Sequence, residues 1–289
     1  MLAGLIHFII GTGKYKGVFG EIGRAYGRNY GCPVFGDLRI IIDKPDEFIQ
    51  HELFVNGIYE PGIIEVIRGV LKPNDVVFDI GANIGYISIF CARLGGVVHA
   101  FEPVPRLASR IKQNALLNNL SSSVYISETA ISNKNSSEIL YVAERKDDGS
   151  HSLLPGVPAK KVQEIQVKTI TLDDYIASSS YYIPQLIKID VEGYEAYVLD
   201  GAVNVLSSQA PPIFIIETGD RLSNQLHESA KTVLQRFYRL SYRVFKIQDC
   251  APFLLEVSAD EINGGLADYL AISTESDRLS LIDVMTKNY

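Results

Sequence analysis

The sequence predicts an α/β fold, namely a doubly wound, mostly parallel sheet with helices on both faces. The prediction rests on a regular alternation, starting at Val76, of short β-branched runs and longer amphipathic stretches. An unbroken apolar run is typical of a strand buried on both faces, whereas apolar residues that recur every three or four positions indicate a helix. Short connections between the two kinds of element are typical of right-handed strand–helix–strand units.

The first part of the sheet is predicted from three apolar runs with two helical stretches between them. The first helical stretch ends at the glycine pair Gly95–Gly96, as a helix C-cap should. The second places Leu107, Ile111 and Ala115 on one face. The expected strands are residues 76–80, 97–102 and 123–128, and the expected helices are residues 84–95 and 105–120.

The middle of the chain departs from this pattern. Two strand-like runs surround the polar loop 145–161, so we expect a hairpin insertion near residues 137–169. Long loops in compact domains are often functional. The alternation then resumes, with strands expected at residues 185–191, 211–218, 242–247 and 268–273 and helices at residues 192–206 and 224–240. This gives about seven core strands, and the last two, with no helix between them, are expected to form an antiparallel hairpin at the sheet edge.

The chain divides near Pro73 into an N-terminal extension and a sheet-forming domain. Residues 1–70 mix glycine-rich turns with helical stretches, and residues 71–289 hold the alternating elements. The first ten residues are apolar, but a membrane-spanning helix needs about 20. We therefore expect no transmembrane segment and a helix that packs on the domain, with peripheral membrane contact as the alternative.

The composition excludes some classes of function. The net charge is −7 and the pI is about 5.3, whereas non-specific nucleic-acid binding needs a basic surface. Cys32, Cys91 and Cys250 are widely spaced and form no CxxC motif. We therefore expect reduced thiols in a cytoplasmic protein, and no zinc site.

The loop after the first expected strand is the best candidate site, because ligands of open α/β sheets bind beyond the carboxyl ends of the strands. A dinucleotide-binding loop would read GxGxxG there, but this chain reads DIGANIG, with Asp79 first. An acid at the strand end opposes a pyrophosphate, which binds bare N–H groups at a helix N-terminus. Asp79 instead suits S-adenosylmethionine, which carries an ammonium, a sulfonium and no phosphate.

Two further features of this region support that interpretation. Gly81 and Gly85 would let the backbone approach the amino-acid part of the ligand closely. Glu102 ends the next strand, where an acid can accept both hydroxyls of a ribose. The simpler alternatives are an N-cap role for Asp79 and a solvated strand-end acid for Glu102.

Four motifs stand out along the chain: VVFDIGANIGYIS, FEPVPRL, TLDDY and LIKIDVEGYEAYVLDGA. Together they resemble the FkbM-type methyltransferases, from about Tyr59 to Ser273. The resemblance implies a class I, Rossmann-like, S-adenosylmethionine-dependent enzyme with a seven-stranded sheet and an antiparallel last strand. The cofactor residues that it implies are Glu60 above the cofactor, Asp79, Gly81, Asn83 and Gly85 at its methionine end, Glu102 at its ribose, and Ala130 and Ser132 near its adenine. The family often has an acid in this last region, whereas residues 129–132 are neutral here, so we expect backbone and apolar contacts to hold the adenine.

Methyl transfer to oxygen needs a group that takes the hydroxyl proton, or a metal that polarises the hydroxyl. Asp190 and Glu217 end two strands that are expected to be sheet neighbours, so their carboxylates should lie close together. Such a pair could act as a base or hold a divalent cation. The simpler interpretation of Asp190 is a buried pair with Lys188. His151 of the long loop is a further candidate base or an ordinary surface histidine, and Glu192 is interpreted as an acid at a helix N-terminus.

The sequence therefore predicts an S-adenosylmethionine-dependent O-methyltransferase that modifies a sugar, a glycan or a natural product. The N-terminal segment and residues 147–161 are expected to shape the acceptor pocket. An NAD-dependent oxidoreductase on a Rossmann sheet is one alternative, and the absent GxGxxG motif and Asp79 count against it. A non-catalytic partner-binding protein of the same fold is another, and the joint presence of Asp79, Gly81, Glu102 and Asp190 counts against it. The acceptor, the base, the use of a metal and the oligomeric state are not defined by the sequence.

Overall fold

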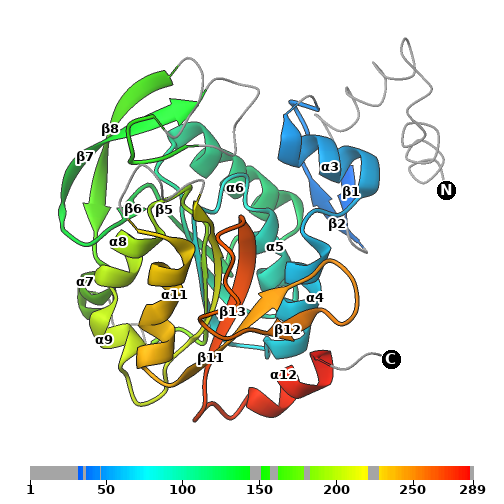
Figure 1. Cartoon of the computed structure of the whole chain (residues 1–289). Helices are drawn as coiled ribbons and strands as arrows, with labels where there is room; N and C mark the ends of the chain where they lie inside the picture. The colour runs from blue at the N-terminus through cyan, green and yellow to red at the C-terminus, as the bar shows by residue number, and fades with distance from the viewer. Residues whose placement is uncertain are drawn as a thin grey trace.

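The computed structural model arranges most of the chain around one central sheet (Figure 1). It describes residues 32–34, 37–45, 47–143, 151–156, 162–178, 183–220 and 228–286. The apolar residues 1–10, predicted to form a packing helix, lie outside these ranges, as do residues 147–150 and 157–161 of the long loop. Among the described residues, no helix is both long enough and apolar enough to cross a membrane.

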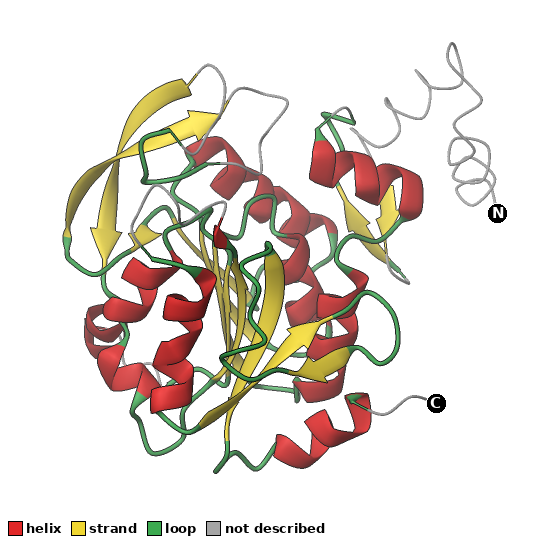
Figure 2. Cartoon of the chain, viewed as in Figure 1, coloured by secondary structure: helices red, strands yellow, loops and turns green. Residues whose placement is uncertain are grey.

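The central sheet has eight strands in the order β12-β11-β13-β10-β9-β3-β4-β5 (Figures 1 and 2). Strands β5, β4, β3, β9 and β10 run parallel, which confirms the predicted α/β fold with its mostly parallel sheet. The chain moves outward from β3 to β5 and then returns to the other side of β3, so the switch point lies between β3 and β9. The strands are β3 (Val76–Ile80), β4 (Val97–Phe101), β5 (Val124–Ser127), β9 (Leu186–Ile189), β10 (Ile213–Thr218), β11 (Tyr242–Ile247), β12 (Leu254–Glu256) and β13 (Ala267–Ser273).

The position of the last strand differs from the sequence prediction. β13 is antiparallel, as predicted, but it lies between β10 and β11 rather than at the edge, and residues 269–273 are buried. The edge strand is β12, an eighth strand within the connection between β11 and β13. The sequence does not reveal this arrangement. The apolar pattern of β13 would be the same whether it lay at the sheet edge beside β11 or between β10 and β11.

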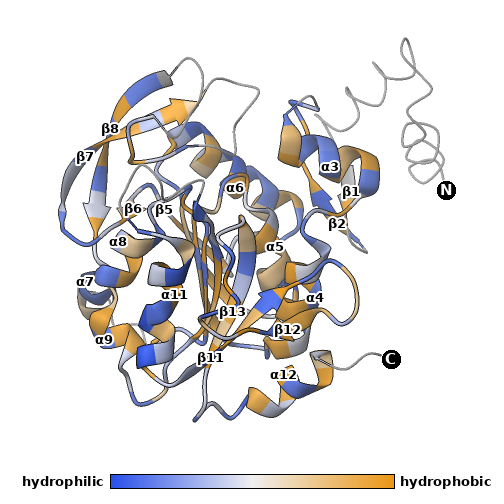
Figure 3. Cartoon of the chain, in the orientation of Figure 1, coloured by the Kyte–Doolittle hydropathy of each residue, from blue (hydrophilic) through white to orange (hydrophobic). Residues whose placement is uncertain are grey.

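Helices cover both faces of the sheet, and alternate residues of each strand pack against them. On β3, for example, Val77 joins the core beneath α4, α5 and α6, whereas Phe78 and Ile80 join the core beneath α7, α8, α9 and α11. Hydrophobic residues gather along the central strands and on α4 and α9 (Figure 3). The helices are α4 (Pro61–Val70), α5 (Tyr86–Arg93), α6 (Pro105–Leu117), α7 (Leu172–Ser178), α8 (Glu195–Asp200), α9 (Val203–Leu206), α11 (Ala230–Arg239) and α12 (Leu279–Met285).

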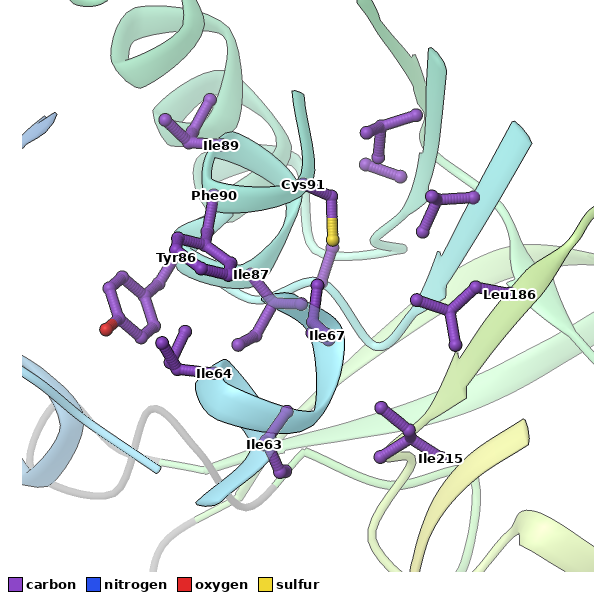
Figure 4. Packing of buried hydrophobic residues seen from close by; sticks show 14 of the residues in the cluster. Ile63, Ile64, Ile67, Tyr86, Ile87, Ile89, Phe90, Cys91, Leu186 and Ile215 are labelled. Atoms are coloured by element: carbon purple, nitrogen blue, oxygen red, sulfur yellow. The ribbon is translucent and has the colours of Figure 1, made fainter. Parts of the chain in front are cut away.

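The contact between α4 and α5 shows how closely this core is packed. Isoleucines of α4 lie next to side chains of α5, with Leu186 of β9 and Ile215 of β10 across from them (Figure 4). Ile64 and Ile67 are both fully buried. Each such side chain contributes about 1.5–3 kcal/mol relative to an exposed one, so the helix that carries Glu60 at its N-cap is firmly seated.

Two smaller sheets flank the central one. β1 (Cys32–Val34) and β2 (Leu38–Ile40) form an antiparallel pair, followed by α3 (Phe48–Asn56). β6 (Ala130–Ile131), β8 (Val162–Ile170) and β7 (Ser136–Ala143) form a three-stranded sheet in the order β6-β8-β7. The antiparallel β7–β8 hairpin is drawn in green in Figure 1.

The helix predicted over residues 192–206 is broken in two. Glu192 and Gly193 have φ values of 52° and 91°, which no α-helix accommodates, so α8 begins only at Glu195. Gly201 and Ala202 then separate α8 from α9, and the backbone of Gly201 packs so closely on Ser132 that a Cβ would lie 2.1 Å from its carbonyl oxygen. The interpretation of Glu192 as an acid at a helix N-terminus is therefore wrong.

Candidate functional site

Asp79 ends β3 with its carboxylate turned into the protein. The side chain is only 1% exposed and accepts a hydrogen bond from the hydroxyl of Ser88 on α5. Burial raises the pKa of Asp79, although the charge of Lys188 and the Ser88 hydroxyl favour its ionised form. The acid is thus held in place by α5 and β9 before any ligand is considered.

The glycine-spaced turn after Asp79 has an unusual backbone. Gly81, Asn83 and Gly85 have φ values of 84°, 51° and 83°, in the left-handed region. A Cβ at Gly81 would lie 1.8 Å from the carbonyl oxygen of Asp190, and one at Gly85 would lie 2.9 Å from Ile111. Internal packing therefore requires both glycines. The close approach of the backbone to a ligand at Gly81 and Gly85, which the sequence predicts, remains a prediction.

Glu102 connects this turn to the neighbouring strand end. Its side chain is 4% exposed, and its two oxygens accept hydrogen bonds from the backbone N–H groups of Asn83 and Val104, each at 2.9 Å. Burial raises the pKa of Glu102 to about 8, with the two N–H groups opposing the shift. Because each carboxylate oxygen has two lone pairs, the group keeps capacity for ribose hydroxyls.

A cluster of acids lies beyond the ends of β9 and β10. Carboxylate oxygens of Asp190, Glu192 and Glu217 lie within 4.8 Å of one another. The structure therefore brings together Asp190 and Glu217, as the sequence predicted. Glu192, which has a left-handed φ of 52°, lies in the same group. Such an oxygen donor set could hold a hard divalent cation such as Mg²⁺, and it could equally share protons.

Burial and mutual repulsion shift the titration of this region toward the protonated forms. Burial, followed by the charges of Asp190 and Asp268, raises the pKa of Glu217 to about 10. Burial and the charge of Asp190 raise the pKa of Glu192 to about 8. Burial raises the pKa of Glu60 to about 7, with Lys188 opposing this shift and Asp190 adding to it. Several acids of the site thus change charge near neutral pH, as groups in ligand sites often do.

Lys188 is the cation that faces these acids. Its Nζ donates a hydrogen bond to Oδ2 of Asp190 at 2.7 Å, and the side chain is 5% exposed. The sequence interpretation of Asp190 as a buried pair with Lys188 thus describes a real contact. Lys188 binds Oδ2 of Asp190, so Oδ1 is the oxygen outside this contact.

The remaining sequence-predicted residues lie in other surroundings. Ala130 is buried in β6, and the hydroxyl of Ser132 is 3.3 Å from that of Tyr194, on the side of α8. Nδ1 of His151 accepts a hydrogen bond from the N–H of Ala143 at 3.0 Å. Nε2 of His151 lies 3.1 Å from a guanidinium nitrogen of Arg106 on α6.

Asp268 is an acid that the sequence analysis missed. It is the second residue of β13, where its register partner on β10 is Glu217, and burial raises its pKa to about 8. The signal that could have found it is the acid near the start of the strand ADYLAIS. Because the last strand was expected at the sheet edge, this acid was not placed beside Glu217.

The fold and these residues define a class of protein. It is an open, Rossmann-like α/β protein with a group of acids, the candidate ligand site, at the carboxyl ends of β3, β4, β9 and β10. The family described as "Methyltransferase FkbM domain" matches residues 79–244, more than half of the chain. The chain therefore belongs to the FkbM methyltransferase domain family, which confirms the resemblance noted from the motifs.

Two characterised relatives are similar over part of their length. The hexuronic acid methyltransferase AglP of Haloferax volcanii is 27% identical over 149 residues, which cover 52% of this chain and 59% of that protein. The 31-O-demethyl-FK506 methyltransferase FkbM of Streptomyces tacrolimicus is 30% identical over 183 residues, which cover 54% of this chain and 68% of that protein.

Solved structures show more distant similarity. An O-methyltransferase from Bacillus cereus has a TM-score of 0.42 at 15% identity, covering 73% of this chain and 78% of that one. A precorrin-6y C5,15-methyltransferase from Geobacter metallireducens has a TM-score of 0.40 at 14% identity, covering 74% and 86%. The fold assignment rests on the strand order of this chain rather than on these scores.

Proposed function

We propose that this protein is an S-adenosylmethionine-dependent methyltransferase that methylates a hydroxyl of a sugar or a natural product. The observation that carries the proposal is the acidic lining of the site at the switch point. Asp79 and Glu102 are buried at the ends of neighbouring parallel strands, with Asp190 on the other side of Asp79. The names of the two relatives, one acting on a hexuronic acid and one on an O-demethyl natural product, support a hydroxylated acceptor.

The chemistry of the donor set fits the cofactor. Carboxylates attract an ammonium and a sulfonium, and Glu102 has lone pairs left for ribose hydroxyls. A pyrophosphate would instead meet Asp79 in a turn that lacks the GxGxxG motif, so an NAD-dependent reaction is not favoured. Asp79, Gly81, Asn83 and Gly85 would hold the amino-acid end, Glu102 the ribose, and residues near Ala130 the adenine.

The acids beyond β9 and β10 would handle the proton of the acceptor. When bound, S-adenosylmethionine supplies a methyl group on a positively charged sulfur, which becomes a neutral thioether as the carbon–sulfur bond breaks and the carbon–oxygen bond forms. Asp190 accepts the hydroxyl proton at Oδ1, because Lys188 occupies Oδ2. Glu217, whose pKa is raised to about 10, carries a proton at neutral pH and donates a hydrogen bond to the acceptor.

The long loop and the N-terminal segment would form the walls of the acceptor pocket. The hydroxyl of Ser152 donates a hydrogen bond to the carbonyl oxygen of Glu192 at 2.8 Å, which supports a place for this loop beside the acids. His151 precedes Ser152, and it would act as the base only after giving up the hydrogen bond that its Nδ1 accepts from Ala143, so we assign that role to Asp190 first. For the compartment we propose the cytoplasm, a reducing environment that suits the exposed thiol of Cys250.

A divalent cation is a second arrangement for the same acids. It is favoured by the 4.8 Å spacing of Asp190, Glu192 and Glu217. Transfer that is lost with EDTA and restored by Mg²⁺ would support the cation, and transfer that is unaffected by EDTA would remove it.

Calorimetry with S-adenosylhomocysteine and with NAD tests the proposal. We expect the first to bind and the second not to bind. Asp79→Asn should weaken S-adenosylhomocysteine binding about tenfold or more, the loss expected for one charged hydrogen bond. Asp260→Asn, which changes an exposed acid paired with Lys231, is the matched control. Binding of NAD without binding of S-adenosylhomocysteine would overturn the proposal. A panel of methyl glycosides, neutral hexoses and hexuronic acids, would then identify the acceptor class.

A further inference from the structure

Lys188 occupies the middle of the candidate site rather than its rim. In the sheet it lies between β3 and β10, with Asp79 as its register partner on β3 and Ile215 on β10. Its Nζ reaches Asp190, two residues further along the chain, at 2.7 Å. A buried ammonium costs several kcal/mol unless neighbouring groups compensate its charge. The surroundings of Lys188 should therefore be built to hold that charge.

Three carboxylates from three separate elements compensate it. Burial alone would lower the pKa of Lys188, but Asp190, Glu60 and Asp79 together raise it well above its ordinary value. Asp190 follows β9, Glu60 is the N-cap residue of α4, and Asp79 belongs to β3. Glu60 has a left-handed φ of 49°, which is uncommon for a glutamate and persists only where the surrounding structure enforces it. Asp190 is the acid in hydrogen-bond contact with the ammonium, and Glu60 and Asp79 act on it through their charge.

The backbone of Asp190 is also fixed by contacts with the chain after Asp79. Its N–H donates to the carbonyl oxygen of Ile80 at 3.0 Å, and its own carbonyl oxygen fills the space that a side chain at Gly81 would need. The backbone of Asp190 is thus held by Ile80 and Gly81, and its Oδ2 is held by Lys188. Oδ1 is therefore the oxygen that Asp190 can offer to a ligand.

We propose that Lys188 is a positioning residue for methyl transfer, whose ammonium holds Asp190 by Oδ2 and presents Oδ1 to the acceptor hydroxyl. The inference rests on the proposed function. It differs from a purely structural role, in which Lys188 would only neutralise buried acids and its loss would lower stability but not the rate of transfer by folded protein.

Three variants separate these roles. Lys188→Met keeps most of the length of the side chain and removes its charge, and Lys188→Arg keeps the charge. Glu60→Gln combined with Lys188→Met removes one buried acid together with the lysine and is compared with Glu60→Gln alone, because Glu60 is itself a candidate cofactor residue. Lys231→Met, at an exposed pair 2.9 Å from Asp260, is the matched control. Each protein is tested for S-adenosylhomocysteine affinity by calorimetry and for kcat and KM with the methyl glycoside that the wild-type protein accepts.

We expect kcat of Lys188→Met, or of the double variant if the single one does not fold, to fall about 100-fold or more, in the range for loss of general-base catalysis. S-adenosylhomocysteine affinity should fall less than about tenfold, and Lys188→Arg should recover part of kcat. In the Asp190→Asn background, Lys188→Met should cause no further loss of kcat, because it acts through Asp190. Folded Lys188→Met protein with wild-type kcat would overturn this inference while leaving the proposed function intact. Failure of the wild-type protein to bind S-adenosylhomocysteine would overturn the proposed function itself.

Discussion

Glu217 shows how the surroundings of a single residue can reverse its ordinary behaviour. It is the next-to-last residue of β10, opposite Asp268, and a carboxylate oxygen of it lies within 4.8 Å of oxygens of Asp190 and Glu192. Burial and these charges raise its pKa to about 10, whereas the unfolded chain would ionise it near its ordinary value of 4.5. A group whose pKa is raised by folding contributes stability that is fully present at low pH and is lost as the pH rises toward the folded value.

Glu217→Gln should therefore stabilise the protein in a pH-dependent way. At pH 5 the free energies of unfolding of variant and wild-type protein should be close, because the folded wild-type side chain already carries its proton. At pH 9 the variant should be more stable by about 1–3 kcal/mol, because glutamine never ionises. Urea unfolding at the two pH values measures the difference. Glu275→Gln, an exposed acid, is the control, and a stability gain that is equal at both pH values would contradict the prediction.

At the scale of elements, α6 holds the N-terminal strand pair through two amides one helical turn apart. Asn118 accepts a hydrogen bond from the N–H of Arg39 at 2.9 Å and donates one to its carbonyl oxygen at 2.7 Å, as a neighbouring strand would. Asn114 accepts from the N–H of Ile41 and donates to the carbonyl oxygen of Ile84 in the turn after β3, both at 2.9 Å. The helix thereby links β2 to the candidate cofactor loop.

Asn118→Ala should loosen β2 without unfolding the central sheet. Both hydrogen bonds to Arg39 are lost, and each contributes about 0.5–1.5 kcal/mol. Hydrogen exchange of residues 38–42 should speed up, while exchange in β3 and β9 should stay slow. Gln113→Ala on the exposed side of the same helix is the control. Equal exchange rates in the two variants would show that the amide does not hold the strand.

At the scale of the whole molecule, the sequence predicted the strands that show hydrophobic periodicity and the acids at the ends of those strands. The alternation after Val76 identified the parallel strands. The acids expected at their ends are Asp79, Glu102, Asp190 and Glu217, and the sheet brings all four to the carboxyl ends of its strands. Lateral strand order is not recorded in periodicity, so the inner position of β13, and with it Asp268, could not be predicted. Whether the four acids bind a cofactor and an acceptor remains a prediction.

A buried ion pair connects the segment before α12 to the segment before β3. It lies at the amino ends of the strands, whereas the candidate site lies at their carboxyl ends. Arg278, just before α12, donates to both oxygens of Asp75, just before β3, and to the carbonyl oxygen of Val70 at 3.1 Å. Both side chains are buried, and α12 packs on α4 where Met285 meets Gly69. Since this pair lies at the amino end of β3, it should serve stability rather than ligand binding.

Arg278→Met should therefore lower the free energy of unfolding by about 3–5 kcal/mol, because the buried carboxylate of Asp75 would lose its cationic partner and keep only the N–H of Lys72. Asp75→Asn combined with Arg278→Met should cost less than Arg278→Met alone, because the uncompensated charge is removed as well. Urea unfolding of wild-type, single and double variants measures both effects as a double-mutant cycle. Folded Arg278→Met protein should bind S-adenosylhomocysteine as the wild-type protein does. A weakened affinity in folded protein would mean that this pair shapes the site across the sheet, and a double variant no more stable than the single one would mean that the buried charge is not the cause.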